Sequence, residues 1–356
     1  MDYFPEFKIH LKILSQLQFA YEKNKLAHAY LFYGSEGTGK EAVALELAKL
    51  LNCEDEQSKP CNKCISCKKI NKLNHPDVKY IFPVASKWKP EDIAKRIDNK
   101  SENIFAPIDQ EGVTNISIDK IRELKNETKY PPYESKQKVY IITETDKMNR
   151  ESANSFLKLL EEPPDYLTIV LITSSKNALL DTIRSRCRSI YFPVLSNDEL
   201  EEVVKKYHPI DERITKVIKF SQGNLKKIFG SLDEDYESKQ QFVLKFLRAA
   251  ASGSAVKISE VIDELYKKRD KNFLIEILNL VILWFQDVIH TDNENRSASF
   301  DFSLELENFS NAYSQSDFEK IISAIELSIQ NIKRNIYAPL LLTNLALGIK
   351  ESLIKK

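Results

Sequence analysis

One segment near the N-terminus has the residues of a phosphate-binding loop. Gly34, Gly37 and Gly39 lie between an apolar run, Ala29–Tyr33, and a helical pattern, and Lys40 directly follows the last glycine. Glycines let successive backbone N–H groups face a phosphate at the positive end of a helix, and a lysine at this position adds a point charge. The order of strand, glycine-rich loop and helix is the context that such a loop requires. The sequence therefore predicts a P-loop.

Both residues that would hold the magnesium ion of a bound nucleotide are replaced. The residue after Lys40 is normally a Ser or Thr whose hydroxyl ligates Mg²⁺, and here it is Glu41. A second apolar run, Val139–Thr143, ends in Thr143 where such folds carry a metal-binding Asp, and Glu144 occupies the water-activating position. A carboxylate at position 41 could hold the cation, but it also repels the triphosphate. We expect no ATP hydrolysis by this chain and weak or absent ATP binding.

Four of the five cysteines lie within fifteen residues. Cys53, Cys61, Cys64 and Cys67 are spaced C-x7-C-x2-C-x2-C. Thiolates at this spacing can bind one ion through a tight turn, and four of them complete a tetrahedral shell with no open position for a substrate. Lysines between the cysteines make the stretch too polar for a buried core. The spacing predicts a structural zinc site, with four reduced thiols or an iron–sulfur cluster as alternatives.

A third candidate is Arg186, which lies between Ser185 and Cys187. It belongs to an arginine-rich stretch between two further apolar runs, Thr168–Thr173 and Ser189–Phe192. An arginine at the edge of a subunit can reach the γ-phosphate held by a neighbouring subunit, as an arginine finger. From the residues alone, this function and a solvated basic strand end are equally good interpretations. Cys187 is expected to be a small buried apolar residue.

Two kinds of pattern organise the elements that position these residues. Up to Pro193, short apolar runs rich in β-branched and aromatic residues alternate with helical segments, which predicts a parallel sheet covered on both faces. Beyond Pro193 a 3.6-residue apolar period predicts helices, one of which is expected to begin at a capping box from Ser316 to Glu319. Lys79–Asn115 is placed only as an insertion of mixed content. We predict an α/β domain over 1–193, a small helical domain over 194–237 and an all-helical domain over 238–356.

Composition limits the classes of function. Fifty-two Lys and Arg balance 52 Asp and Glu, so no net charge attracts the chain to nucleic acid or to an acidic membrane surface. This balance counts against a zinc-dependent DNA-binding module, whose affinity would come from neutralising phosphates. The N-terminus lacks the pattern of a signal peptide, and the most apolar stretch is too short and too polar to span a bilayer. We expect a soluble, cytoplasmic protein with reduced cysteines and no membrane partner.

Together these segments resemble the delta-prime subunits of the bacterial DNA polymerase III clamp loader, which are relatives of the gamma/tau motor subunits in the AAA+ superfamily. The matching segments follow the family's order over most of residues 25–193, and the C-terminal third matches only loosely. They are His28–Phe32 with the P-loop, the four cysteines, His75–Asp77, Ile118–Leu124, Lys138–Met148, Leu159–Pro164 and Thr182–Cys187.

The resemblance implies a RecA-like α/β domain with an inserted zinc module, a small helical lid, and a helical collar that assembles a hetero-pentamer with gamma/tau and delta subunits. It also implies a non-catalytic stator within the DNA polymerase III holoenzyme, a DNA-directed DNA polymerase. Such a stator offers Arg186 to the ATP site of an adjacent gamma/tau subunit, while the complex loads the sliding clamp on primed DNA during replication.

The altered residues Glu41 and Thr143 fit a stator. Two other residues keep an alternative open, because Glu144 is retained and Lys226 stands where motor subunits carry an arginine that senses nucleotide. The alternative interpretation is an active gamma/tau-like AAA+ ATPase motor subunit of the clamp loader.

Overall fold

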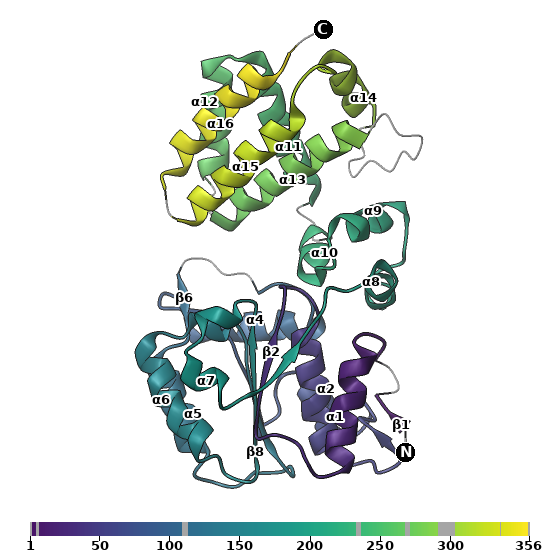
Figure 1. Ribbon diagram of the computed structural model, residues 1–356, viewed down its shortest axis with the longest axis vertical. Helices are drawn as coiled ribbons and strands as arrows, with labels where there is room; N and C mark the ends of the chain where they lie inside the picture. The colour runs from purple at the N-terminus through teal and green to yellow at the C-terminus, as the bar shows by residue number, and fades with distance from the viewer. Residues whose placement is uncertain are drawn as a thin grey trace. The chain divides into compact units, whose positions relative to one another are not determined.

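The computed structural model of this 356-residue chain describes residues 2–4, 7–108, 113–232, 236–267, 271–290, 303–334 and 336–354. The chain divides into two compact units, Met1–Ile210 with Ser221–Gly230, and Asp211–Phe220 with Ser231–Lys356. The first unit contains the strands, and the second consists of helices (Figure 1). The separate lid over 194–237 stays a prediction.

A five-stranded parallel sheet forms the centre of the first unit, with the strand order β4-β7-β8-β2-β9. In that order the strands are Val78–Ile81, Lys138–Ile142, Leu167–Thr173, Ala29–Tyr33 and Arg188–Tyr191. Leu31 of β2 lies opposite Leu171 of β8 and Ser189 of β9. The inner strands are buried along nearly their whole length, as expected when both faces of a parallel sheet are covered. The predicted parallel α/β architecture is confirmed.

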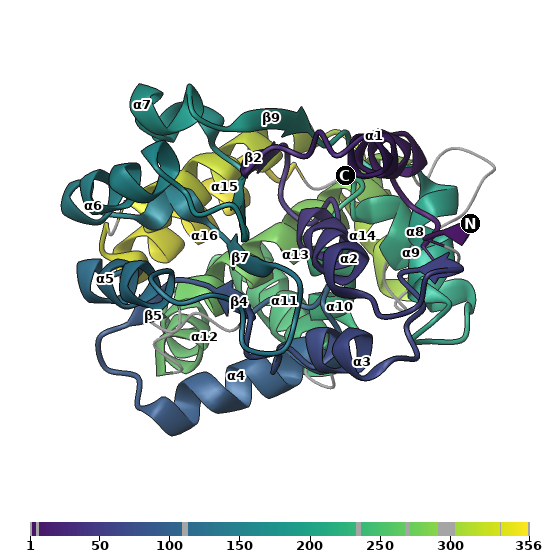
Figure 2. The same ribbon diagram turned by 90° about the horizontal axis from the view of Figure 1, so that it is seen from below.

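Helices cover each face of the sheet (Figure 2). One apolar cluster joins α1 and α2 to one face, and a second cluster joins α5, α6 and α7 to the other face. These helices are Leu11–Glu22, Lys40–Asn52, Ile118–Glu127, Arg150–Glu161 and Asp181–Arg184. Neighbouring residues of β2 enter opposite clusters, Phe32 the first and Leu31 the second, because side chains alternate along a strand. Because the strands are parallel, the carboxyl ends of β2 and β7 lie at the same end of the sheet, with β8 between them, and the P-loop and Thr143 follow there.

The segment after the cysteines contributes to the core, so the prediction that an insertion starts at Lys79 was wrong. Val78–Ile81 is the edge strand β4. Val78 and Ile81 are buried, whereas Lys79 and Tyr80 between them are half-buried, so no regular apolar pattern marks this strand. The other short elements of the first unit are β1 (Asp2–Tyr3), β3 (Ser58–Lys59), α3 (Ile65–Asn71), β5 (Val84–Ala85), α4 (Pro90–Glu102), β6 (Thr114–Asn115), η1 (Thr145–Lys147) and η2 (Lys176–Ala178).

The remaining elements are helical, as the 3.6-residue period predicts. They are α8 (Asn197–Val204), α9 (Glu212–Phe220), α10 (Leu225–Ser231), α11 (Tyr236–Ser252), α12 (Ala255–Lys267), α13 (Lys271–His290), α14 (Ser303–Ala312), α15 (Phe318–Lys333) and α16 (Ala338–Ser352). One apolar cluster that includes the buried Trp284 and Phe285 joins α11 to α16. No helix in the described part of the chain is long and apolar enough to cross a membrane.

The capping residue of α15 differs from the predicted one. Asp317 caps this helix, because its carboxylate accepts a hydrogen bond from the backbone N–H of Lys320 at 3.0 Å. Ser316, the predicted cap, instead accepts a hydrogen bond from the backbone N–H of Ile354 at 2.8 Å. The tertiary contact with the C-terminal segment therefore takes the serine hydroxyl away from the helix end.

Candidate functional site

The P-loop connects the carboxyl end of β2 to the first turn of α2. β2 ends at Tyr33 and α2 begins at Lys40, and the three glycines of the connection have positive φ, a region that favours glycine. A Cβ on Gly37 would lie 1.7 Å from Oδ1 of Asn224. The backbone N–H of Leu225 donates to the carbonyl oxygen of Gly37 at 2.9 Å. Glycine at position 37 therefore lets the start of α10 lie directly against the loop.

Lys40 folds back onto its own loop. Its buried Nζ donates to the carbonyl oxygens of Gly34, at 2.9 Å, and Ser35, and it lies 3.2 Å from Oγ1 of Thr38. Burial and the nearby positive charge of Lys226 lower the pKa of Lys40 to about 8. The ammonium that a P-loop directs at a phosphate is thus held by oxygen atoms of the loop itself.

Glu41 is the centre of a buried charge cluster. Its Oε2 lies 2.7 Å from Nζ of Lys100 on α4 and accepts a hydrogen bond of 2.6 Å from the hydroxyl of Tyr80 on β4. Its Oε1 lies 3.1 Å from Nζ of Lys226 on α10. Burial alone would raise the pKa of Glu41, but the charges of Lys100 and Lys226 outweigh burial and hold this pKa well below its ordinary value. The carboxylate is therefore ionised and bound by three donors of the protein.

The end of β7 also differs from a magnesium-binding site. Thr143 is buried, and its hydroxyl donates to the carbonyl oxygen of Ile81 at 3.4 Å. Glu144 has a left-handed backbone, with φ of 48°, and its carboxylate lies 2.7 Å from Nζ of Lys147. Magnesium bound to a nucleotide normally takes a Ser or Thr hydroxyl from the helix and an Asp carboxylate from this strand end. The side chains at positions 41 and 143 therefore fit Mg²⁺-nucleotide poorly.

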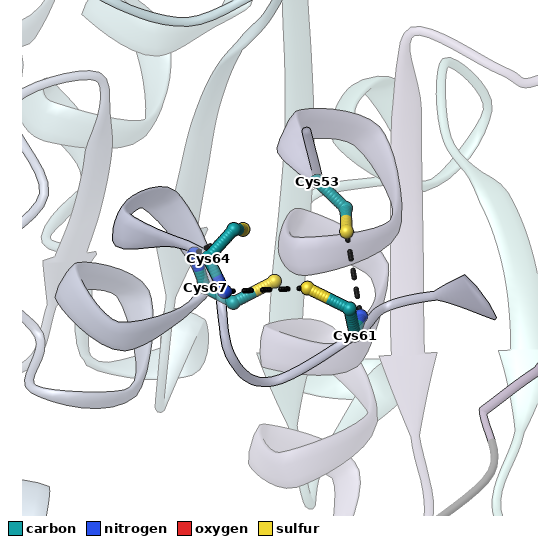
Figure 3. Close-up of side chains that lie close together, drawn as sticks. All are labelled: Cys53, Cys61, Cys64 and Cys67. Carbon is teal, nitrogen blue, oxygen red and sulfur yellow. Dashed lines mark hydrogen bonds between the residues drawn. The ribbon is translucent and has the colours of Figure 1, made fainter. Parts of the chain in front are cut away.

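The four clustered cysteines converge on one point (Figure 3). Cys53 follows the end of α2, Cys61 lies in the next loop, and Cys64 and Cys67 lie at the start of α3. Their Sγ atoms all lie within 4.8 Å of one another. Four sulfur atoms at about 2.3 Å from a tetrahedral ion are separated by about 3.8 Å, so a small contraction would bring them into contact with one ion. This group could bind a metal ion.

Backbone N–H groups favour negative charge on three of these sulfur atoms, whereas burial raises the pKa of the Cys53 and Cys67 thiols. The N–H groups of Cys61, Cys64 and Cys67 point at the preceding cysteine sulfur, with N···S distances of 3.3, 3.3 and 3.4 Å. For Cys61, burial opposes ionisation, but hydrogen bonds from N–H groups outweigh it and lower the pKa to about 7. Thiolates brought this close repel one another unless a cation lies between them, which is the electrostatic condition for a metal site.

The motif His75–Asp77 connects the cysteine module to the sheet. The buried Asp77 carboxylate accepts hydrogen bonds from three successive backbone N–H groups, those of residues 133–135, at 2.6, 2.9 and 3.0 Å. Burial alone would raise the pKa of Asp77, but these hydrogen bonds outweigh burial and hold the pKa below its ordinary value. Nε2 of His75 lies 3.3 Å from Oγ of Ser66 on α3. The motif is therefore a structural connection between α3, β4 and the loop before β7.

Arg186 lies in the turn between α7 and β9. Its side chain is 36% exposed, its NH1 donates to the carbonyl oxygen of Thr182 at 3.0 Å, and its NH2 lies 2.8 Å from the carboxylate of Glu161 at the end of α6. The hydroxyl of Ser185 also donates to the carbonyl oxygen of Thr182, and Cys187 is buried in the second apolar cluster. The guanidinium is therefore accessible on the first unit and is oriented by two partners.

Several partners of the predicted site residues were not expected from the sequence. Lys100 and Tyr80 bind Glu41, and Glu161 binds Arg186. One signal was available, because Pro90 followed by two acidic residues is typical of a helix N-terminus and indicates α4. The polar sequence of α4 does not distinguish the buried Lys100 from the solvated residues around it.

Comparisons with known proteins agree with the resemblance that the motifs indicate. A family model described as DNA polymerase III, delta subunit, matches residues 9–196. DNA polymerase III subunit delta' of Bacillus subtilis is 36% identical over 191 residues, which are 54% of this chain and 50% of the relative. DNA polymerase III subunit tau/gamma of Haemophilus influenzae is 29% identical over 273 residues, which are 75% of this chain and 33% of the relative. The chain thus spans half or less of the length of these relatives.

A solved structure supports the fold over nearly the whole chain. The crystal structure of a DNA polymerase III, gamma subunit-related protein from Thermotoga maritima aligns with 95% of this chain and 99% of its own, with a TM-score of 0.50 and 18% identity. At this identity the likeness concerns the fold alone. The family match, in contrast, covers more than half of the 356 residues and includes the P-loop, the four cysteines and Arg186. The chain therefore belongs to the family described as DNA polymerase III, delta subunit.

Proposed function

We propose that this chain is a non-catalytic stator, a delta-prime subunit, of a DNA polymerase III clamp loader. In this role it assembles with gamma/tau and delta subunits and helps ATP bound to its neighbours drive loading of the sliding clamp on primed DNA. The observation that carries the proposal is that Lys100 and Lys226 bind the carboxylate of Glu41. Glu41 is the residue after the P-loop lysine, and a P-loop ATPase uses the residue at this sequence position to bind Mg²⁺. A P-loop altered in this way supports a structural role in a ring of ATPases.

Arg186 is the residue through which the stator would act on its neighbour. Its guanidinium is partly exposed and is oriented by Thr182 and Glu161. Exposed ion pairs contribute only about 0–1 kcal/mol, so a γ-phosphate on an adjacent subunit can displace the Glu161 carboxylate. A planar guanidinium can then bind two phosphate oxygens at once.

We also propose that the metal bound by Cys53, Cys61, Cys64 and Cys67 is Zn²⁺. Four thiolates in a tetrahedral arrangement are typical of structural zinc, and a closed set of four ligands leaves no position for catalysis. The module is joined to the sheet through α3 and the His75–Asp77 motif, so bound zinc would stabilise the first unit.

Reconstitution tests the stator function. Arg186→Ala in this chain should lower ATP turnover at the receiving site of the neighbouring subunit by at least about tenfold, because arginine fingers supply factors of about 10³–10⁵. The matched control is Arg122→Ala, since Arg122 is also exposed and paired, with Asp119 at 3.2 Å. Equal turnover in the two reconstituted complexes would reject the finger function.

An active motor subunit is the alternative, with Glu41 or Glu144 holding Mg²⁺. The ion pairs of Glu41 with two lysines and of Glu144 with Lys147 count against it. ATP turnover by the isolated chain, abolished by Lys40→Ala, would establish the motor and reject the stator. We expect no turnover by the isolated chain.

A further inference from the structure

We propose that the Glu41 carboxylate is an internal counter-ion beside the P-loop, which neutralises Lys100 and Lys226 and joins the start of α2 to α4 and α10. This inference rests on the proposed non-catalytic function and extends it, because it names the group that neutralises the two ammonium groups in place of a nucleotide phosphate. It also assigns the site a latent ligand class, the inorganic polyphosphates and nucleoside triphosphates.

The position of Glu41 is chemically suited to an internal anion. Glu41 lies in the first turn of α2, where unpaired backbone N–H groups and the helix dipole favour negative charge. Its two oxygen atoms are bound by the ammonium groups of Lys100 and Lys226 and by the hydroxyl of Tyr80. Ammonium and hydroxyl donors of this kind also bind phosphate oxygens. The protein has therefore assembled an anion-binding set and has supplied the anion from its own helix.

Charges of both signs lie around the P-loop. The ammonium groups and carboxylates that influence one another here are Lys40, Lys100 and Lys226, and Glu36, Glu41 and Glu144, of which Glu144 is also paired with Lys147. A polyphosphate entering this cluster would meet carboxylates that already neutralise these ammonium groups. Neutralising Glu41 alone would leave an excess of positive charge at the helix N-terminus, which is the condition under which P-loops bind phosphate.

The two segments that bind Glu41 also contact each other and the loop. The phenyl ring of Phe105, after α4, stacks on Phe229 of α10 with centroids 6.3 Å apart and planes at 19°. The backbone of Leu225 donates to Gly37, and Nζ of Lys100 donates to the carbonyl oxygen of Ala106 at 2.7 Å. The Glu41 carboxylate thus lies where three segments meet, and its loss affects all three.

Burial makes the ion pairs of Glu41 contribute strongly to the stability of the segments that they join. The side chains of Lys100 and Lys226 are 1% and 18% exposed, and that of Glu41 is 12% exposed. Removing one partner of a buried ion pair leaves the other charge unpaired in a poor solvent for it, which is strongly destabilising. Glu36 offers a matched contrast, because its side chain is 63% exposed and lies 3.5 Å from the same Lys226 ammonium. Its neutralisation should have little effect.

Hydrogen exchange of the full, metal-loaded chain tests the proposal. Glu41→Gln should speed amide exchange in residues 225–230 and in α4 by at least about tenfold, whereas Glu36→Gln should change it by less than about twofold. Inorganic tripolyphosphate, used as the probe, should slow exchange in Glu41→Gln and leave the wild-type chain unchanged. It should also bind Glu41→Gln at least about tenfold more tightly than wild type.

A second variant separates the effect of Glu41 on α10 from its effect on α4. Lys226→Gln should speed exchange in residues 225–230 while α4, still held by Lys100, stays protected. If Glu41→Gln unfolds as a whole, this variant decides, and unchanged exchange in residues 225–230 would overturn the proposal. Equal exchange in Glu41→Gln and Glu36→Gln would also overturn it, as would a wild-type chain that tripolyphosphate protects as strongly as Glu41→Gln. These outcomes leave the Arg186 reconstitution intact, so the two proposals fail independently.

Discussion

The cysteine module and the P-loop are both composed like ligand sites, and they differ in the sign of the charges that the chain supplies. The module brings together four sulfur atoms that carry like charge when ionised, and N–H groups of the same segment donate to three of them. The P-loop brings together ammonium groups and carboxylates, and the Glu41 carboxylate already has two lysine partners. A group of one sign needs an external counter-ion, whereas a group of both signs does not.

This difference teaches that a binding motif has to be evaluated together with its counter-charges. The glycines and Lys40 are those of a nucleotide-binding loop, and the backbone adopts the corresponding strand–loop–helix conformation. Lys226, from far along the chain, nonetheless makes an ion pair with Glu41 at the loop. In the cysteine module, by contrast, all the groups that define the site come from fifteen consecutive residues.

The largest expected effect is at the cysteine module. Cys64→Ser should release the metal and lower the stability of the first unit, because structural zinc supplies about 10–16 kcal/mol of binding free energy in small zinc domains. Metal analysis should find one zinc per wild-type chain and none in the variant, and thermal unfolding should occur at a lower temperature.

Cys187→Ser is the control for this prediction. Burial raises the pKa of Cys187 to about 12, so this thiol is neutral and lies outside the cluster of sulfur atoms. Its replacement should leave the zinc content unchanged. A wild-type protein that is metal-free, folded and insensitive to chelators would remove the distinction between the two regions.

The second effect tests how the module is connected to the sheet. Asp77→Asn should lower the free energy of unfolding by about 2–4 kcal/mol, because hydrogen bonds to a buried charged group contribute about 1.5–3 kcal/mol each and the amide fits three N–H donors poorly. Since the pKa of Asp77 is lowered in the folded chain, its contribution is complete above the ordinary Asp pKa of about 3.9 and is lost as the pH falls through the folded value.

Urea unfolding from neutral to acidic pH measures both parts of this prediction. The exposed Asp119 provides the control, and Asp119→Asn should cost less than about 1 kcal/mol because its pair with Arg122 is solvated. If Asp77→Asn and Asp119→Asn unfold at the same urea concentration, the His75–Asp77 motif has another function.

The smallest effect concerns the P-loop. Burial lowers the pKa of His10, which a hydrogen bond to the carbonyl oxygen of Thr38 offsets only in part. Below the ordinary histidine pKa of about 6.5 the unfolded chain therefore binds a proton that the folded chain does not. Stability should fall as the pH decreases through this range. His10→Gln should flatten this part of the profile of urea midpoint against pH, and an unchanged slope would show that His10 does not cause it.

Much of the fold could be predicted from the sequence, because its signals are local. The runs Ala29–Tyr33 and Thr168–Thr173 form β2 and most of β8, since continuous apolar runs are typical of strands buried on both faces. β4 could not be predicted in this way, because Lys79 and Tyr80 lie at a sheet edge and are only half-buried. The cap of α15 moved from Ser316 to Asp317 because a distant backbone group, at Ile354, competes for the serine hydroxyl.

The sequence by itself determined the P-loop, the convergence of the four cysteines and the parallel sheet, since each depends on residue types at short spacing and on backbone geometry. Only the tertiary structure decided that Glu41 would be bound by Lys100 and Lys226, and that Arg186 would be oriented by Glu161. Long polar side chains have no periodic pattern that reveals their partners. Their pairing depends on which segments the sheet and its covering helices bring within a few ångströms of each other.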